Sequence, residues 1–216
     1  MKLYGFWRSL ATFRVRIALN LKGIPYEETM INLMKGEQFA DAYKAVNPQS
    51  VLPALYDGDG PPLFQSLAIV EYLDETHPEP PLLPTAPRDR ARVRALAQIV
   101  AADGHPLVIP RIRNYLNQQY GVDEKTAEDW CRHWIGRACE ALEANLASDA
   151  RTGRFCHGDT LTVADLCLAS HLAGAGFFKV DLKPYPTCAR IYDACMAVDA
   201  FARAHPLKQP GAPASV

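Results

Sequence analysis

The sequence predicts a protein of two parts, an α/β domain followed by an all-α domain. Three observations support this expectation. Over the first 76 residues, short strand-like segments are interleaved with segments of helical periodicity. Residues 77–87 are dense in proline, which cannot continue a helix. From residue 88 onward, apolar residues recur at helical spacing almost to the end of the chain. A length of 216 residues allows one or two domains.

The N-terminal elements are expected in the order strand, helix, strand, helix, strand, strand, helix. That order suits a small α/β sandwich built on a mixed sheet. Pro53 falls inside the third strand, where it lacks the N–H of a ladder bond, so it indicates an edge, a bulge or a cis peptide bond. The expected ranges are strands at 2–6, 26–33, 51–56 and 62–64 and helices at 10–21, 37–46 and 66–76.

The second part is expected to be all-α. We predict an α/β domain over residues 1–80, a linker at 81–87 and a helical domain at 88–216. The stretch from Thr162 to Asp165 fits a capping box, which starts a helix. Alternate arginines at the head of the first long helix are expected to be a solvated face. Those arginines are Arg88, Arg90, Arg92 and Arg94, and the long helices are expected near 88–118, 124–148, 162–175 and 186–203.

Composition excludes several classes of function. Lys plus Arg number 23 and Asp plus Glu number 24, so no overall charge would draw the protein to nucleic acid or to an anionic membrane. No apolar run approaches the ~20 residues that span a bilayer, and the N-terminus does not resemble a signal peptide. The six cysteines lack zinc-ligand spacing. We therefore expect a cytoplasmic protein with reduced, mostly buried thiols and no metal.

Two places in the first domain could bind a small anion. Ser9 lies where the first strand turns into the first helix, and Gln65-Ser66 opens the last helix of the domain directly after a strand. Exposed amides and the helix dipole at such positions favour an anion or a thiolate. The alternative is that both serines only cap their helices. A cis bond at Pro53, between the two places in sequence, would free backbone to pair with an extended ligand.

Motifs spread over nearly the whole chain carry a family resemblance. The matching segments are Trp7-Arg8-Ser9, residues 13–19 and 21–26, Asn47-Pro48, residues 51–55, residues 65–69 with 71–73, Gly158-Asp159, residues 162–168, residues 180–182 and Pro184-Tyr185-Pro186. With these segments the chain resembles the zeta class of glutathione transferases, which includes maleylacetoacetate and maleylpyruvate isomerases.

The resemblance implies a thioredoxin-like N-terminal domain that holds glutathione, an all-α C-terminal domain that forms much of the second-substrate site, and a homodimer. By family match, Pro53 is the cis-proline and the backbone of Leu52 meets the glutathione cysteine. Gln65 and Ser66 then hold the γ-glutamyl end. The further residues implied to contact glutathione are Gln38 and His105.

The implied reaction is cis-trans isomerisation of a maleyl diacid in the breakdown of tyrosine or other aromatic compounds. Thiolate adds to the double bond, the bond rotates, and elimination regenerates glutathione. Ser9 matches the first residue of the family's Ser-Ser-Cys signature, and a lowered thiol pKa would raise the reactive fraction. Leu10 and Ala11 stand where the signature has its second serine and cysteine.

Two arginines match substrate-binding positions of the family. Arg8 lies beside Ser9, and Arg111 lies in the helical domain; forked guanidinium groups suit carboxylates. Arg113 is expected to be the more solvated of the pair 111 and 113. A third family arginine is replaced by Gly176 or Phe177. Two alternatives stay open: a general transferase that acts on small electrophiles such as haloacids, and a non-catalytic glutathione-fold module.

Overall fold

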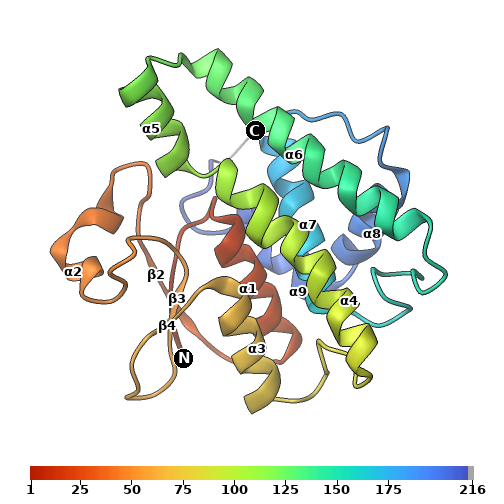
Figure 1. The fold of residues 1–216 in the computed structure, drawn as a ribbon. Coiled ribbons are helices and arrows are strands. Elements are labelled where there is room, and N and C mark those ends of the chain that lie inside the picture. Colours follow the sequence, from red (N-terminus) through yellow and green to blue (C-terminus); the bar gives the residue numbers. More distant parts are fainter. Residues whose placement is uncertain (214–216) are drawn as a thin grey trace. The chain divides into compact units, whose positions relative to one another are not determined.

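The first part of the chain is a four-stranded mixed sheet with helices. We describe residues 1–213 of the protein from a computed structural model (Figure 1). The elements of this part are β1 (Lys2–Gly5), α1 (Leu10–Leu21), β2 (Glu27–Met30), η1 (Glu37–Phe39), α2 (Asp41–Lys44), β3 (Ala54–Tyr56), β4 (Leu63–Phe64) and α3 (Ser66–Thr76). The order of strands and helices predicted from the sequence is confirmed, and only the expected helix at 37–46 is divided, because Ala40 is extended.

The strand directions bring several connections to one edge of the sheet. The strand order is β2-β1-β3-β4, with β2 parallel to β1 and β3 antiparallel to both of its neighbours. Tyr4, Ala54 and Phe64 are aligned across the sheet. The C-terminal ends of β1, β2 and β4 and the N-terminal end of β3 therefore lie on the same side of the sheet, across the strand direction. We call this side the sheet edge, and α1 and α3 each begin there.

Each face of this sheet is covered. On one side α1 packs against α3, and Phe13, Ile17 and Ile69 are fully buried there. Burial of a side chain of this size contributes roughly 1.5–3 kcal/mol. The other side carries an aromatic cluster built around Phe6 and Tyr43. In Figure 1 the strands run between α2 and the pair α1 and α3.

The described chain divides into two compact units, Met1–Leu82 with the segment from Val198 onward, and Leu83–Ala197. The C-terminal helix α9 (Asp199–Ala204) packs against α1, and η4 (Pro206–Lys208) follows it. A hydrogen bond of 3.0 Å from Asn20 Nδ2 to the carbonyl of Ala200 fixes this contact. The division at residues 80 and 88 stays a prediction.

The second unit is helical throughout. The expected continuous helix at 88–118 is wrong. The chain passes through a short π-helix and a 3₁₀ turn before Pro110 starts a new helix. Pro106 and Pro110 lack the N–H groups that a continuous helix needs. The expected helix at 186–203 is also divided. The elements are α4 (Pro87–Gln98), η2 (Ile99–Gly104), η3 (His105–Leu107), α5 (Pro110–Tyr120), α6 (Glu124–Ala147), α7 (Val163–Phe177) and α8 (Pro186–Met196).

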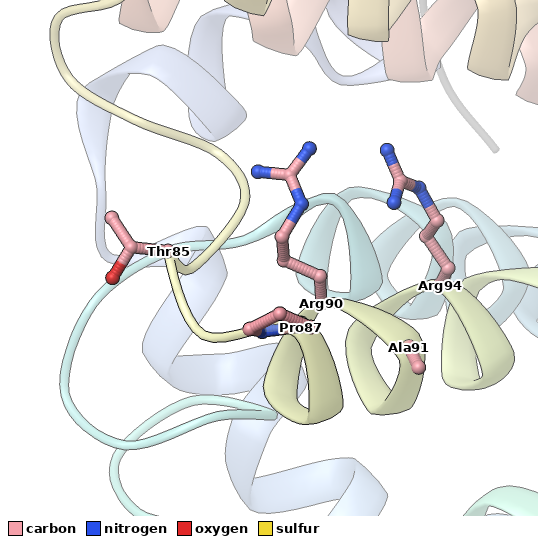
Figure 2. Close-up of a pocket in the computed structure, with 5 residues that line it drawn as sticks. All are labelled: Thr85, Pro87, Arg90, Ala91 and Arg94. Carbon is pink, nitrogen blue, oxygen red and sulfur yellow. The ribbon is translucent and has the colours of Figure 1, made fainter.

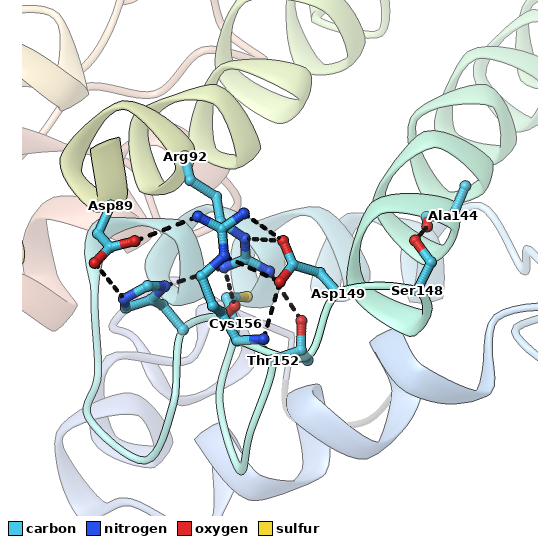
Figure 3. Close-up of polar contacts among 9 residues, drawn as sticks. Asp89, Arg92, Ala144, Ser148, Asp149, Thr152 and Cys156 are labelled. Atoms are coloured by element: carbon cyan, nitrogen blue, oxygen red, sulfur yellow. Dashed lines mark hydrogen bonds and ion pairs between the residues drawn. The ribbon is translucent and has the colours of Figure 1, made fainter. Parts of the chain in front are cut away.

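Arg92 is not solvated, contrary to the prediction from its sequence pattern. Its side chain is about 10% exposed and its Nε donates to Asp149 at 2.8 Å. It also donates to the carbonyl of Cys156 at 2.7 Å and to the hydroxyl of Thr152 at 2.9 Å. Figure 3 shows Arg92 at the centre of these contacts, so the guanidinium ties α4 to the loop after α6.

Other features of this unit follow the sequence. The capping box of Thr162 and Asp165 is present at the start of α7, as predicted. All six cysteines are buried and free, which confirms their expected burial. Over residues 1–213, we find no helix with both the length and the apolar character that a membrane crossing requires.

Candidate functional site

The turn between β1 and α1 presents Ser9 at the start of a helix. Residues 7 and 8 form the turn, closed by a 2.9 Å hydrogen bond from the Ser9 N–H to the carbonyl of Phe6. The Ser9 Oγ accepts a hydrogen bond of 3.2 Å from the N–H of Thr12. The serine therefore caps α1, which was the alternative role considered for it from the sequence. Arg8, the residue before it, is half-buried.

Capping leaves the Ser9 hydroxyl able to act on a ligand. A serine hydroxyl has two acceptor positions and one donor, and the cap uses an acceptor position. The O–H is still available to donate to a negatively charged group at the helix N-terminus, where the dipole also favours it. Leu10 and Ala11, which replace polar residues of the family signature, are both buried.

The loop before β3 is held by hydrogen bonds from the aromatic side of the sheet. Tyr43 donates to the carbonyl of Val51 at 2.8 Å, and Asn47 donates to the same oxygen at 2.9 Å. Burial raises the pKa of Tyr43, so its hydroxyl remains a donor. The next peptide bond, Leu52–Pro53, is cis. The loop therefore delivers Leu52 to the same sheet edge that carries Ser9.

Gln65 and Ser66 begin α3 at this edge. Gln65 has a φ of 67°, a left-handed conformation that costs about 1–3 kcal/mol in a residue with a side chain and is concentrated at functional sites. Its amide Nε2 donates to Gln49 Oε1 at 2.8 Å. Ser66 is almost fully buried, and its Oγ accepts a 3.2 Å hydrogen bond from Arg14 NH1. Both side chains are thus fixed by protein contacts.

Several buried polar side-chain atoms of this unit have no hydrogen-bond partner among residues 1–213, and two of them lie on uncharged side chains. One is Gln38 Oε1, in the segment that follows β2, and the other is Thr12 Oγ1, in the first turn of α1. A buried polar atom without a partner costs about 1–3 kcal/mol, and a bound ligand or water is the usual explanation. Gln38 Oε1 can accept a hydrogen bond from an amide or ammonium group.

The helical unit holds the other two predicted residues. Arg111 is exposed in the first turn of α5. His105 is half-buried and follows the short π-helix η2, a kind of helix irregularity that is frequent at functional sites. Arg113 has a buried Nε and lies over the ring of Phe178 at 5.6 Å, so the expectation that it is the more solvated arginine is wrong.

A separate hollow lies beside the start of α4. It measures about 560 Å³, and Figure 2 shows the guanidinium groups of Arg90 and Arg94 extending the same way. None of the predicted site residues lines it; the lining residues are Thr85, Pro87, Arg90, Ala91 and Arg94.

The protein's own buried thiols are poor nucleophiles. Burial raises the pKa of Cys139 to about 12 and raises the pKa of Cys156, Cys188 and Cys195 as well. A thiol must ionise to attack, so these four remain inert at neutral pH. Among residues 1–213, no group of three or more His, Cys, Asp or Glu side chains is placed to hold a metal ion.

Sequence reasoning did not find Arg14 or Gln49. Arg14 lies within a continuous run of buried residues in α1, and the available signal in the sequence was an arginine between the apolar residues Phe13 and Val15. Gln49 carries no signal of its own, because its contact with Gln65 depends on the tertiary fold.

Comparison with known proteins identifies the family. Residues 3–81 match the model of the glutathione S-transferase N-terminal domain, and residues 108–202 match that of the C-terminal domain. A maleylpyruvate isomerase from Ralstonia sp. is 49% identical over 97% of this chain and 99% of its own.

Two solved structures are similar over nearly the whole chain. A maleylacetoacetate isomerase from Methylobacterium extorquens AM1, with bound malonate and glutathione, is 54% identical with a TM-score of 0.98, covering 99% of this chain and 100% of its own. The holo structure of a maleylpyruvate isomerase, a bacterial zeta-class enzyme, is 48% identical with a TM-score of 0.96 at the same coverage. The chain therefore belongs to the glutathione S-transferase family, in its zeta class.

Proposed function

We propose that the protein is a glutathione-dependent cis-trans isomerase of a maleyl diacid, either maleylacetoacetate or maleylpyruvate. The observation that carries the proposal is the shared sheet edge, where the N-termini of α1 and α3 meet the cis peptide before β3. Two similar proteins support it, since they are named as isomerases of these two diacids.

Glutathione fits the polar groups at this edge. Ser66 and the first amides of α3 suit the γ-glutamyl carboxylate, with Gln65 beside them. Leu52 offers backbone to the cysteine residue of glutathione, and Gln38 Oε1 supplies a buried acceptor. We assign His105, in the helical unit, as a further glutathione contact. When bound, glutathione supplies the thiolate that adds to the double bond and leaves again after rotation.

Ser9 is the proposed catalytic hydroxyl. Its Oγ accepts from the Thr12 N–H, so its proton is available for the thiolate. A hydrogen bond to the charged form, together with the amides of α1, lowers the thiol pKa below its free value of about 8.5. Ser9 thereby raises the fraction of nucleophile at neutral pH.

Arg8 and Arg111 are the proposed partners of the two carboxylates. Arg8 adjoins Ser9 in the β1–α1 turn, and Arg111 has an exposed side chain at the head of α5. Charge-assisted hydrogen bonds from guanidinium groups suit a planar diacid better than an uncharged electrophile. Malonate, which accompanies glutathione in the Methylobacterium extorquens AM1 structure, is itself a diacid and favours this assignment over a general transferase.

Turnover by matched arginine variants tests the proposal. Consumption of maleylpyruvate and maleylacetoacetate is followed with and without glutathione. Arg111→Ala is expected to lower kcat/KM for the diacid by about 10–100-fold, since a hydrogen bond to a charged group contributes roughly 1.5–3 kcal/mol. Arg88→Ala, which removes an exposed arginine at the start of α4, is the control and is expected to behave as the wild type.

The alternatives give different results in the same assay. A protein that turns over neither diacid yet conjugates halogenated substrates is a general transferase. A protein that binds glutathione with an unshifted thiol pKa and turns over nothing is a binding module. Either result would refute the isomerase proposal.

We further propose that the protein is a cytoplasmic homodimer that acts in the breakdown of aromatic compounds. Homologous isomerases of maleylacetoacetate and maleylpyruvate support the pathway class. Light scattering after gel filtration tests the oligomeric state: twice the chain mass of 23.9 kDa is expected. A single-chain mass at micromolar concentration would contradict it.

A further inference from the structure

We infer that Arg14 is a positioning residue for glutathione: it holds the hydroxyl of Ser66 as a dedicated donor to the γ-glutamyl carboxylate. This inference rests on the proposed glutathione site. Arg14 already orients the Ser66 hydroxyl at the start of α3 before any ligand binds.

The geometry places a buried guanidinium directly behind Ser66. Arg14 is about 2% exposed and lies on α1, and Ser66 is about 6% exposed in the first position of α3. The two residues are 52 positions apart in sequence, and NH1 donates to Oγ at 3.2 Å. The contact therefore joins α1 and α3, the two helices whose N-termini lie at the sheet edge.

The chemistry of the pair fixes the direction of the serine proton. A guanidinium has only donors, so the Ser66 O–H cannot be directed to Arg14. An acceptor position of Oγ is occupied by Arg14, and the proton must point to another group. Donation from a cation also polarises the hydroxyl and strengthens the bond that the hydroxyl itself donates. The result is a donor that suits a carboxylate at the head of α3.

Arg16 shows that burial alone does not give this role. It is equally buried on α1, two residues further on, yet its Nε donates to Glu28 on β2 at 2.8 Å. The two arginines thus leave α1 in different directions, one to a neighbouring helix and one to the sheet. Arg16 provides a matched control for the loss of a buried guanidinium.

The test is the preference for glutathione over an analogue that lacks only the γ-glutamyl carboxylate, 4-aminobutanoyl-cysteinyl-glycine. Kd is measured for both ligands by calorimetry without any diacid, so turnover is not needed. Arg14→Met is expected to reduce the preference about tenfold, in the range of couplings within one hydrogen-bond network. Arg14→Lys, which keeps a charged donor, is expected to restore part of it.

Two controls separate this role from simple loss of structure. Arg16→Met is expected to change both Kd values by the same factor and leave the preference intact. In a Ser66→Ala background, Arg14→Met is expected to have no further effect on the preference. If Arg14→Met does not fold, Arg14→Lys and Arg14→Gln are compared in its place.

The proposal is overturned if the Arg14 variants weaken both ligands equally, or if their effect on the preference persists in Ser66→Ala. A wild-type protein that binds both ligands equally would also overturn it. Because binding is measured without a diacid, failure of the isomerase proposal leaves these outcomes unaffected.

Discussion

The hydroxyl oxygen of Ser9 accepts a 3.2 Å hydrogen bond from the N–H of Thr12, so the proposed catalytic serine is also the N-cap of its helix. The structural and the functional interpretation of this serine are therefore compatible. The cap uses an acceptor position, and the thiolate would use the proton.

Ser9→Ala is expected to have two separable effects. The free energy of unfolding falls by about 1 kcal/mol because the cap is lost. The pKa of the glutathione thiol in the complex rises toward its free value because a donor is lost. Absorbance of the thiolate against pH and chemical denaturation measure the two effects. Asp123→Ala removes the cap of α6, which binds the Thr126 N–H at 2.7 Å, and is expected to lower stability with the thiol pKa unchanged.

Gly5→Ala is expected to destabilise the sheet edge. A methyl group at Gly5 would overlap the carboxylate of Glu28 and approach the Thr12 side chain to 2.6 Å. The carboxylate is held by Arg16 and has little room to move, so a cost of about 1–3 kcal/mol is expected from overpacking. Denaturant unfolding measures it.

Gly176→Ala is the matched control for that substitution. Gly176 lies in α7, and a methyl group there would meet nothing within 4 Å. Replacing a helical glycine by alanine in open space is expected to leave stability unchanged or raise it by up to about 1 kcal/mol. Equal losses in the two variants would contradict the account of Gly5.

His205 is expected to make stability depend on pH. Burial, with a smaller effect of Lys208, lowers its pKa below about 6.5, the ordinary value. Its Nδ1 accepts from the Leu207 N–H at 3.3 Å, which requires the neutral ring. As pH falls below about 6.5 the unfolded chain binds the proton first, so the stabilisation present above that pH is lost.

His205→Asn isolates this contribution, since asparagine can cap the same N–H without titrating. The difference in unfolding free energy between wild type and variant is expected to shrink from pH 7.5 to pH 5. A difference that stays constant over this range would show that His205 is not the titrating group.

Arg92→Met is expected to lower stability by about 2 kcal/mol. Its removal leaves the carbonyl of Cys156, which is about 1% exposed, without a strong donor, and an unsatisfied buried carbonyl costs roughly 1–3 kcal/mol. Thermal unfolding measures the loss. Arg137→Met removes an arginine whose partner Glu140 is exposed, and no measurable change is expected there.

Local secondary structure could be predicted from the sequence more accurately than side-chain contacts could. The helix at Ser66–Thr76 begins and ends at the predicted residues, because it follows a strand directly and a proline-rich stretch limits its C-terminal end. The break before Pro110 was not predicted, although Pro106 and Pro110 stand in the sequence, because apolar periodicity continues across it.

Long-range contacts could not be predicted in this way. Arg92 and its partner Asp149 are 57 positions apart, and Arg14 and Ser66 are 52 apart. Whether an arginine is solvated or buried depends on which element packs over it, and residue spacing carries no information on that. Ser9, Gln65 and Ser66 could be named because helix starts and a proline in a strand are local features. The other candidate residues were named from the family resemblance; they are Arg8, Gln38, Leu52, His105 and Arg111.

The most direct test of glutathione-dependent isomerisation is proton NMR of maleylpyruvate or maleylacetoacetate mixed with the enzyme and a substoichiometric amount of glutathione. We expect complete conversion of the cis diacid to the trans diacid, with all of the glutathione recovered in its free form. Conversion that stops when the glutathione is used up, with a stable conjugate as product, would contradict it.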